Sequence, residues 1–366
     1  LRPAPVPFVG NDRWRAEILP DRVGRFAFTV QAWVDKYASL CRELEVKRSA
    51  GADISIQIAE CLQLLRRAQE RARGNERKII TSALNWLGDA SIESSAAILL
   101  APDLREVMWE VDEHRFEFRH APAFPIEVDR PQAAFAAWYE LFPRSATNTP
   151  ARHGTFADVI RRLPALHDMG FDVLYLPPIH PIGSSNRKGK NNDLRAEPED
   201  VGSPYAIGCS QGGHEAIHPD LGSLDDFRRL RDAAAEHNME LALDFAVQCS
   251  PDHPWLRDHP EWFIWRPDGS VRYAENPPKQ YEDIVNVDFY AEGAIPHLWI
   301  ALRDIVLLWA NEGIRIFRVD NPHTKPLPFW EWLIAQVRAR NPDVIFLSEA
   351  FTRPKMMYRL GKIGFS

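Results

Sequence analysis

The sequence predicts an α/β protein in which a β-sandwich domain with a helical insertion, residues 1–130, precedes part of a (β/α)8 barrel of the TIM type, residues 131–366. Three observations support this fold class. After residue 131, near-continuous apolar runs alternate with helical patterns, as in parallel strands that are covered on both faces. Polar residues follow several different strands. No G-x-G-x-x-G motif opens a helix, which favours the barrel over a doubly wound sheet.

The first part of the chain mixes two periodicities. Residues 25–33 alternate between apolar and polar or small side chains, which predicts a half-buried strand. Residues 53–73 and 76–87 carry apolar side chains three and four positions apart, and they predict a helical hairpin insertion over about 36–90. Residues 105–130 look like strands again. The hairpin is either local core or an oligomer contact, so a homodimer is possible.

The second part predicts a series of alternating strands and helices. Ser223 is a suitable N-cap with carboxylates in the following turn, and Gly313 ends the longest helical pattern. Eight strands close such a barrel, and about five are counted, so the chain is expected to stop after the fifth. The predicted strands are 134–142, 171–179, 239–247, 314–319 and 343–350, and the predicted helices are 155–170, 223–238, 294–313 and 328–341.

Composition excludes several function classes. The net charge of −7 and the absence of a long basic face argue against a nucleic-acid partner. The basic run Arg66–Arg77 is interpreted as a solvated helix face. Four cysteines without a CxxC pair, and histidines without HExxH spacing, predict no metal, no cofactor and no disulfide framework. No apolar run reaches 18 residues and no signal-peptide pattern opens the chain, so we expect a cytoplasmic protein without membrane contact.

One short motif imitates a serine hydrolase. Residues 208–212 match G-x-S-x-G, the nucleophile elbow. That elbow needs a strand before it and a helix after it. Pro204 precedes the motif and a loop-like segment follows it, so we reject this chemistry.

Two carboxylates follow consecutive predicted strands, Asp320 after 314–319 and Glu349 after 343–350. Arg318 and Asp320 share a face because side chains alternate along a strand, and the guanidinium favours an ionised carboxylate. Neighbouring strands are about 4.8 Å apart, so the pair can approach the ~5–5.5 Å separation of a retaining glycosidase. A single strand-end carboxylate is usually an N-cap or an ion-pair partner, and spacing alone does not decide between these readings. Asp244 is equally compatible with a structural role at the barrel rim.

The segments RVDNPHTKP and FLSEAFTRP resemble the nucleophile and acid/base regions of the α-amylase superfamily, glycoside hydrolase family 13. LDFAVQCSPDHPW resembles its first conserved region, although Gln248 and Cys249 stand where most members carry an Asn-His pair. That departure, together with YAENPPKQYEDI and RKGKNN, is similar to the GlgE-type maltosyltransferases, which use maltose 1-phosphate. The resemblance covers essentially the whole chain.

The resemblance implies a role for each matching residue. Asp320 would be the nucleophile, Glu349 the general acid/base and Arg318 the arginine that holds the nucleophile. The phosphate of the donor would be bound by side chains that can donate hydrogen bonds to it. The implied phosphate-binding residues are Asn276, Lys279 and Tyr281, and the implied sugar contacts are Lys188, Asn192, Tyr205, Gln248 and Asn321.

The predicted function is retaining transfer of a maltosyl unit from α-maltose 1-phosphate to an α-1,4-glucan. Another hydrolase or transglycosylase of the superfamily is one alternative. A catalytically inert glycan-binding piece is the other, because the barrel is expected to be incomplete and the family's third acidic residue has no counterpart before Ser366.

Overall fold

The computed structural model describes residues 4–149 and 152–366. The chain divides into two compact units, one formed by Leu1–Phe26 with Glu127–Ser366 and the other by Ala27–Ile126. In the described ranges, no helix is both long enough and apolar enough to span a membrane.

The larger unit is built on a five-stranded sheet. Every neighbouring pair is parallel, and the strands lie side by side in the order in which they occur in the sequence. A doubly wound sheet reverses its strand order at a switch point. This sheet has no such reversal, so the five strands are consecutive barrel strands, as predicted. They are β7 (Trp138–Glu140), β8 (Val173–Leu176), β9 (Glu240–Phe245), β12 (Ile316–Val319) and β13 (Ile345–Ser348).

The two faces of the sheet differ because side chains alternate along each strand. One face carries large apolar residues such as Leu243 and Phe317, which join the helices in the main core. The other face carries a small apolar cluster that includes Ala242 and Ile316. Asp244 and Arg318 follow these last two residues by two positions, so they belong to this second face. The charged groups therefore lie on the face opposite the main core.

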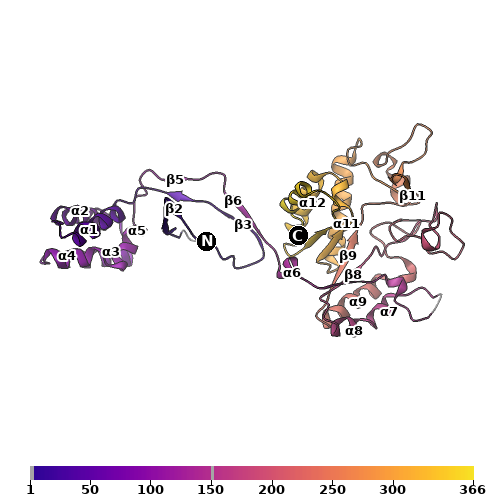
Figure 1. Ribbon diagram of the computed structural model, residues 1–366, viewed down its shortest axis with the longest axis horizontal. Helices are drawn as coiled ribbons and strands as arrows, with labels where there is room; N and C mark the ends of the chain where they lie inside the picture. The colour runs from indigo at the N-terminus through magenta and orange to yellow at the C-terminus, as the bar shows by residue number, and fades with distance from the viewer. Residues whose placement is uncertain (1–3, 150–151) are drawn as a thin grey trace. The chain divides into compact units, whose positions relative to one another are not determined.

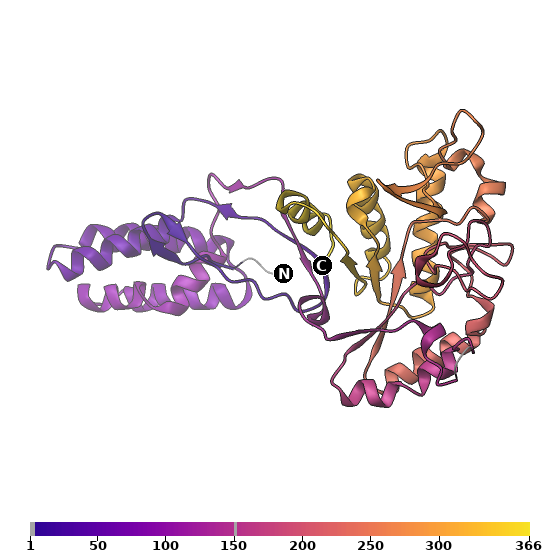
Figure 2. The ribbon, with the colours of Figure 1, turned by 45° about the vertical axis from the view of Figure 1, so that its right-hand side comes forward.

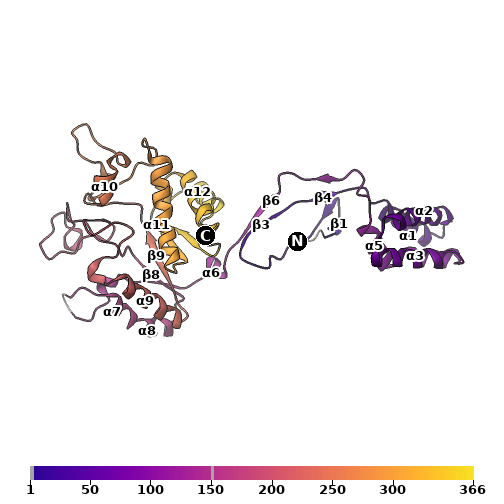
Figure 3. The same ribbon diagram turned by 180° about the vertical axis from the view of Figure 1, so that it is seen from behind.

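Helices connect the strands (Figure 1). The predicted helix 155–170 is two helices, because Pro164 has no backbone N–H to continue a helical ladder and lies instead in a first turn. Ser223 caps its helix in a capping box with Asp226, as its sequence position suggests. Figure 3 shows α11 and α12 side by side. The helices of this unit are α6 (Pro131–Ala134), α7 (Phe156–Ile160), α8 (Leu163–Asp168), α9 (Leu224–Glu236), α10 (Pro254–Asp258), α11 (Trp299–Asn311), α12 (Leu327–Arg338) and α13 (Pro354–Lys362).

A β-hairpin lies between β9 and α11 in the sequence. Its strands, β10 (Tyr273–Asn276) and β11 (Lys279–Val285), pair antiparallel around a Pro277–Pro278 turn. Near its base, Val285 forms an isolated bridge with Cys249 in two backbone hydrogen bonds of 2.7 and 3.0 Å. The hairpin is thereby fastened to the segment that follows β9.

The smaller unit contains a five-helix bundle where two helices were predicted (Figure 2). The interpretation of residues 105–110 as strand is wrong. Pro102 opens a helix there, and Leu104, Val107 and Met108 bury one helical stripe, whereas the every-second pattern of Val107, Trp109 and Val111 imitates a strand. The helices are α1 (Lys36–Ser49), α2 (Ser55–Arg71), α3 (Gly74–Leu87), α4 (Ile92–Leu99) and α5 (Pro102–Glu110).

The remaining N-terminal strands pair as three two-stranded ribbons in the described residues, so the sandwich itself stays a prediction. The ribbons are β1 (Phe8–Gly10) with β2 (Arg13–Trp14), β3 (Gly24–Phe28) with β6 (Phe124–Val128), and β4 (Gln31–Ala32) with β5 (Phe118–Arg119).

Candidate active site

The register of the sheet sets the heights of the two carboxylates. Val319 on β12 is paired with Ser348 on β13, and the next residues along are Asp320 and Glu349. The ladder continues to both of them, because the N–H of Asp320 donates to the carbonyl of Phe245 (3.2 Å) and that of Glu349 to the carbonyl of Val319 (3.0 Å). Two carboxylates therefore emerge at one level at the carboxyl end of adjacent parallel strands, where barrel enzymes place their reacting groups.

Arg318 joins three carboxylates. Its Nη1 lies 2.8 Å from Asp244 Oδ2 and 3.0 Å from Asp320 Oδ1, and its Nη2 lies 2.5 Å from Glu349 Oε1. The planar guanidinium holds several donors in a fixed fork, so one side chain can orient all three acceptors. We call Asp244, Arg318, Asp320 and Glu349 the strand-end cluster.

Glu349 and Asp320 have different surroundings. Asp320 is 6% exposed and accepts a 2.8 Å hydrogen bond from Gln248 Nε2. Asn321 contacts both carboxylates, through its side chain to Asp320 and its backbone N–H to Glu349, each at 3.4 Å. Burial and the neighbouring Asp320 raise the pKa of Glu349. A raised pKa suits a proton donor, whereas a carboxylate that accepts from Arg318 and Gln248 suits a nucleophile.

Asp244 is the most buried member of the cluster, at 4% exposed. Its Oδ2 accepts hydrogen bonds from the hydroxyls of Tyr175 and Tyr205, the latter at 3.2 Å. Burial raises the pKa of Asp244 to about 7, although Arg318 opposes the shift. Asp244 thus helps to orient Arg318, which agrees with the structural role considered for this residue. Tyr205 is hydrogen-bonded to the same carboxylate.

The predicted phosphate-binding residues all lie on the β10–β11 hairpin. Asn276 and Lys279 are a register pair that flanks the turn, and both are exposed. Tyr281 is half-buried and packs, as Tyr205 does, against a small cluster containing Ile284. In the described residues no hydrogen bond links Asn276 or Lys279 to the strand-end cluster. The structure therefore packs Tyr281 and Tyr205 against the same small cluster and leaves the other two side chains exposed at the hairpin tip.

The predicted sugar contacts near residue 190 separate into two kinds. Lys188 is only 7% exposed. Burial raises the pKa of Asp283 on β11, and the positive charge of Lys188 opposes that rise. Asn186, on the same loop, donates to the carbonyl of Glu282 (3.1 Å). Asn192 is exposed in a short 3-10 turn with a left-handed φ of 64°. The loop is thus attached to β11 through the Lys188 end, and among the described residues Asn192 forms no hydrogen bond with the strand-end cluster.

With this geometry in hand, comparisons with known proteins identify the family. A family model for the catalytic domain of α-amylases matches residues 140–324, about half of the chain. The chain belongs to the α-amylase family. A second family model, described as domain N/S of α-1,4-glucan:maltose-1-phosphate maltosyltransferase, matches residues 2–130. Both findings confirm the resemblance read from the motifs.

Relatives of this α-amylase family member carry the same maltosyltransferase name. The protein of Pseudomonas aeruginosa is 60% identical over 98% of this chain, and that of Burkholderia pseudomallei is 58% identical over 98%. The chain covers 54% of the first and 32% of the second, so it spans about half of these relatives or less. The crystal structure of an α-amylase from Lactobacillus plantarum is 32% identical, with a TM-score of 0.50 over 65% of this chain and 50% of that one.

Two residues of the site were not singled out from the sequence. The sequence pattern places Tyr175 in a buried strand and Lys325 in the segment RVDNPHTKP, and it assigns neither of them to the site. Lys325 Nζ lies 3.3 Å from the backbone carbonyls of both Asp320 and Asn321. Burial lowers the pKa of Lys325, and the nearby Asp320 opposes that shift. The periodicity of β8 places Tyr175 on the charged face and could have suggested it, whereas nothing in the pattern indicates that Lys325 folds back on its own turn.

The fold also brings together groups that their spacing in the sequence keeps apart. His214, His253 and Cys249 have possible metal-ligand atoms within 4.8 Å of one another, all buried. Each ring nitrogen of these two histidines has a hydrogen-bond partner when both rings are neutral. His253 Nδ1 accepts from the backbone N–H of Trp255 (3.1 Å), so the proton of His253 lies on Nε2, which donates to His214 Nδ1 (3.2 Å). The other nitrogen of His214 then donates to the Ala246 carbonyl (2.9 Å). Burial lowers the pKa of His214 to about 4 and of His253 to about 2.

Close packing explains both glycines of the false hydrolase motif. A Cβ on Gly208 would lie 2.3 Å from His253 Cδ2, and one on Gly212 would lie 2.5 Å from the Cβ of Ala216. Neither position has room for a side chain. Cys209 and Gly212 form an isolated antiparallel bridge. In the part of the chain that the structure describes, no strand directly precedes the motif and no helix directly follows it, so Ser210 is no nucleophile elbow.

Proposed function

We propose that the whole protein containing this chain transfers a maltosyl unit, with retention, from α-maltose 1-phosphate to the non-reducing end of an α-1,4-glucan. The observation that carries the proposal is Arg318 bound to both Asp320 and Glu349 at the ends of adjacent strands. The name shared by the relatives and the match to domain N/S support the choice of donor.

In the first step, a carboxylate oxygen of Asp320 attacks the anomeric carbon and the bond from that carbon to the phosphate oxygen breaks. Glu349, whose raised pKa favours the protonated form, gives its proton to the departing phosphate. Arg318 and Gln248 hold the nucleophile in one orientation, since each binds a different oxygen of Asp320.

In the second step, the 4-hydroxyl of the acceptor glucan attacks the β-maltosyl ester on Asp320. Glu349, now ionised, takes the hydroxyl proton, and the ester bond breaks to return the Asp320 carboxylate. Both displacements invert the anomeric carbon, so the product keeps the α configuration. Arg318 contacts both Asp320 and Glu349, so its positive charge stabilises whichever of these two carboxylates is ionised.

Donor selection is assigned to the hairpin and to its neighbouring loop. Asn276, Lys279 and Tyr281 supply an amide, an ammonium and a phenol, all of which can donate to phosphate oxygens. Lys188, Asn192 and Tyr205 would contact the sugar. The hairpin base is hydrogen-bonded at Cys249, next to Gln248, so phosphate binding and the nucleophile share one backbone segment.

The test uses a 2-fluoro-maltosyl donor with a good leaving group. The fluorine slows both steps and the leaving group speeds formation, so the glycosyl-enzyme accumulates. After incubation with the whole protein, peptide mapping by mass spectrometry should locate a maltosyl adduct on Asp320. An adduct on any other residue would refute the mechanism. Release of maltose 1-phosphate from glycogen on addition of inorganic phosphate separates this transferase from a hydrolase, which would release free sugar with or without phosphate.

Two further expectations belong to the same proposal. A 366-residue piece on its own would turn over little donor, because barrel enzymes build their sites from the loops of many strands. Assay of this chain beside the whole protein measures that directly. Sedimentation of the whole protein tests the predicted homodimer.

A further inference from the structure

The carboxylate of Asp252 accepts four hydrogen bonds from a distant loop. Its Oδ2 accepts from the backbone N–H of Ser184 (2.6 Å), the backbone N–H of Ser185 (2.8 Å) and the hydroxyl of Ser184 (2.9 Å). Its Oδ1 accepts from the hydroxyl of Ser185 (2.6 Å). Asp252 lies in the segment that follows β9, 67 and 68 positions along the chain from the two serines. One side chain therefore clamps two consecutive residues of another segment.

This set of donors suits an ionised carboxylate. Two backbone amides and two hydroxyls donate, and an ionised carboxylate carries no proton and offers about four lone-pair sites. Burial by itself would raise the pKa of Asp252, but the hydrogen bonds from Ser185 and Ser184 outweigh burial and lower the pKa. Hydrogen bonds to a charged acceptor are stronger than those between neutral groups. The clamp is therefore strong at neutral pH.

The clamped loop carries two residues that are proposed to contact the donor sugar, Lys188 and Asn192. Lys188 is only 7% exposed. Within residues 4–149 and 152–366, its ammonium forms no hydrogen bond and no ion pair. Withdrawing a charge from water is costly unless a partner is supplied, and the hydroxyl oxygens of a sugar can accept from an ammonium. The position of this loop therefore decides where the donor sugar finds its partner.

The loop, the segment after β9 and strand β11 are joined in pairs. Asp252 joins the loop to the segment. Asn186 joins the loop to β11, because its side chain donates to the carbonyl of Glu282 (3.1 Å). Cys249 joins the segment to β11 through its bridge with Val285. Three segments that are distant in the sequence thereby form one closed circuit of hydrogen bonds.

The backbone beneath Asp252 is also fixed. A Cβ on Gly183 would lie 2.4 Å from the Cβ of Ser250, so the loop and the segment pack closely there. The hydroxyl of Ser250 accepts from the backbone N–H of Asp252 (3.0 Å) and donates to the carbonyl of Gly208. The carboxylate of Asp252 therefore holds the loop at a set position relative to Gln248, four residues earlier on the same segment.

We propose that Asp252 is a positioning residue for the donor sugar. Asp252 does not touch the substrate; it holds residues 184–192 so that Lys188 meets a sugar hydroxyl at a fixed distance from Asp320. Gln248 donates to Asp320 from the same segment, so one short stretch of backbone holds both the sugar-binding loop and the nucleophile. This inference rests on the function proposed above.

The experiment is steady-state kinetics of the whole protein with maltose 1-phosphate. Asp252→Ala should raise KM about tenfold and lower kcat by less than about threefold, because a sugar contact is made alike in the ground state and the transition state. Asp252→Asn keeps an oxygen for the two backbone N–H groups, and its amide can donate to Ser185. Its KM should therefore stay within about threefold of the parent value.

Asp53→Ala is the matched control. Asp53 also accepts from the backbone N–H and the hydroxyl of a serine, Ser55, but it is exposed and lies in the other unit. Its substitution should leave both kinetic constants unchanged. Thermal melting verifies that each variant is folded. Ser184→Ala with Ser185→Ala removes two of the four bonds from the side of the loop, and it should raise KM in the same direction where Asp252→Ala is unstable.

A double-mutant cycle decides whether Asp252 acts through Lys188. Lys188→Met should itself raise KM, and adding Asp252→Ala should raise KM by less than about twofold further. Full additivity of the two increases would overturn the proposal, as would a fall in kcat with an unchanged KM in Asp252→Ala. Equal impairment in Asp252→Asn and Asp252→Ala would also overturn it, because the charge and not the clamp would then act on the site.

Hydrogen exchange of the whole protein without substrate separates this inference from the proposed function. Peptides covering residues 184–192 should exchange faster in Asp252→Ala than in the parent and in Asp53→Ala, because the loop opens more readily. Unchanged exchange in Asp252→Ala would refute the clamp. A parent protein that releases no phosphate from maltose 1-phosphate would instead refute the proposed function.

Discussion

The strand-end cluster and the β10–β11 hairpin are both assigned to one reaction, yet they are held in place differently. Asp244, Arg318 and Asp320 lie on paired strands or one residue beyond them, where register fixes their heights. Lys279 lies at an exposed hairpin tip, beyond a Pro-Pro turn. The hairpin is fastened at its base, where Val285 pairs with Cys249.

This difference indicates a division of labour. Bond breaking depends strongly on the position of the reacting atoms, and the groups proposed for it lie on strands or directly after them. Choice of donor can vary among members of one fold by changing a loop. Gln248 connects the two regions, because it donates to Asp320 and directly precedes the residue that anchors the hairpin. Substitutions in one region should therefore abolish turnover, and substitutions in the other should change the donor.

Asp320→Asn should have the largest effect. It removes the proposed nucleophile and keeps the size of the side chain, so turnover of maltose 1-phosphate should fall about 10⁴-fold or more. Initial rates of phosphate release by the whole protein measure this. Asp304→Asn, on exposed α11 surface, is the matched control. Residual turnover within tenfold of the parent would show that the strand-end cluster is not the reacting centre.

Lys279→Ala tests the hairpin half of the comparison. Loss of the ammonium proposed to bind phosphate should lower kcat/KM for maltose 1-phosphate by about 10- to 100-fold. Trapping by a maltosyl fluoride, which has no phosphate, should continue at nearly the parent rate. Lys362→Ala, an exposed lysine of α13, controls for charge. If both donors lose activity equally, the hairpin positions the reaction and does not select the donor.

The strand period allowed the sequence to predict the first region better than the second. Alternation places Arg318 and Asp320 on one face, and consecutive strands bring Glu349 to the same level; the structure has both features. The separation of the two carboxyl groups stays a prediction. Tyr175 and Asp244 meet across 69 positions, and such contacts depend on the register between neighbouring strands, which one sequence does not encode locally.

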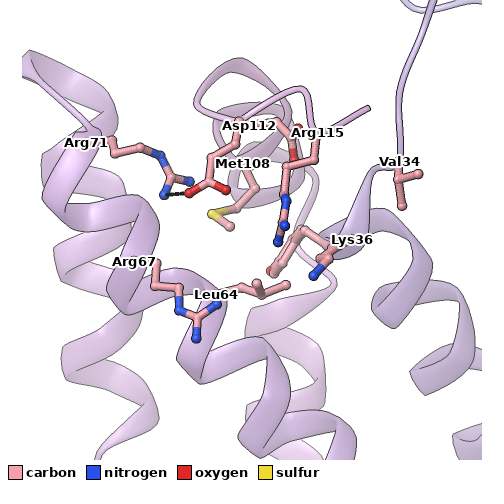
Figure 4. A pocket seen from close by; sticks show the side chains of 10 residues that line it. Val34, Lys36, Leu64, Arg67, Arg71, Met108, Asp112 and Arg115 are labelled. Atoms are coloured by element: carbon pink, nitrogen blue, oxygen red, sulfur yellow. Dashed lines mark hydrogen bonds and ion pairs between the residues drawn. The ribbon is translucent and has the colours of Figure 1, made fainter. Parts of the chain in front are cut away.

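The helical unit also shows that a regular period can be predicted from the sequence and that short elements cannot. Helical stripes predicted α2 and α3, but the short helix at Pro102–Glu110 was missed because a few apolar residues satisfy either period. Arg67 and Arg115 line one hollow of this unit, although 48 positions separate them (Figure 4). The sequence pattern does not predict this, because the arginines of α2 look alike.

Lys325→Met should have an intermediate effect on the reacting centre. The ammonium that binds the Asp320 and Asn321 carbonyls would be lost, and turnover should fall about tenfold. Removal of this cation also raises the pKa of Glu349 further, so the alkaline limb of the kcat profile should move to higher pH. Lys325→Arg should restore part of the rate. A fall in stability with an unmoved pH profile would assign Lys325 a purely structural role.

The smallest effect concerns stability and can be measured on this chain without any substrate. The pKa of Asp244 is about 7 when folded and 3.8 in its ordinary state, so the folded chain binds more protons between these values. The contribution of Asp244 to the free energy of unfolding should therefore be greatest below pH 4, and it should fall as the pH rises towards 7. The slope has a limit of about 1.4 kcal/mol per pH unit.

Urea unfolding at pH 5, 6, 7 and 8 measures that slope, and Asp244→Asn should flatten it even if the variant is less stable at every pH. Asp304→Asn should keep the parent slope. An Asp244→Asn slope equal to that of the parent would mean that Asp244 stays ionised beside Arg318 throughout. The cluster would then carry one more negative charge, and Arg318 would have to balance Asp244 as well as Asp320 during the reaction.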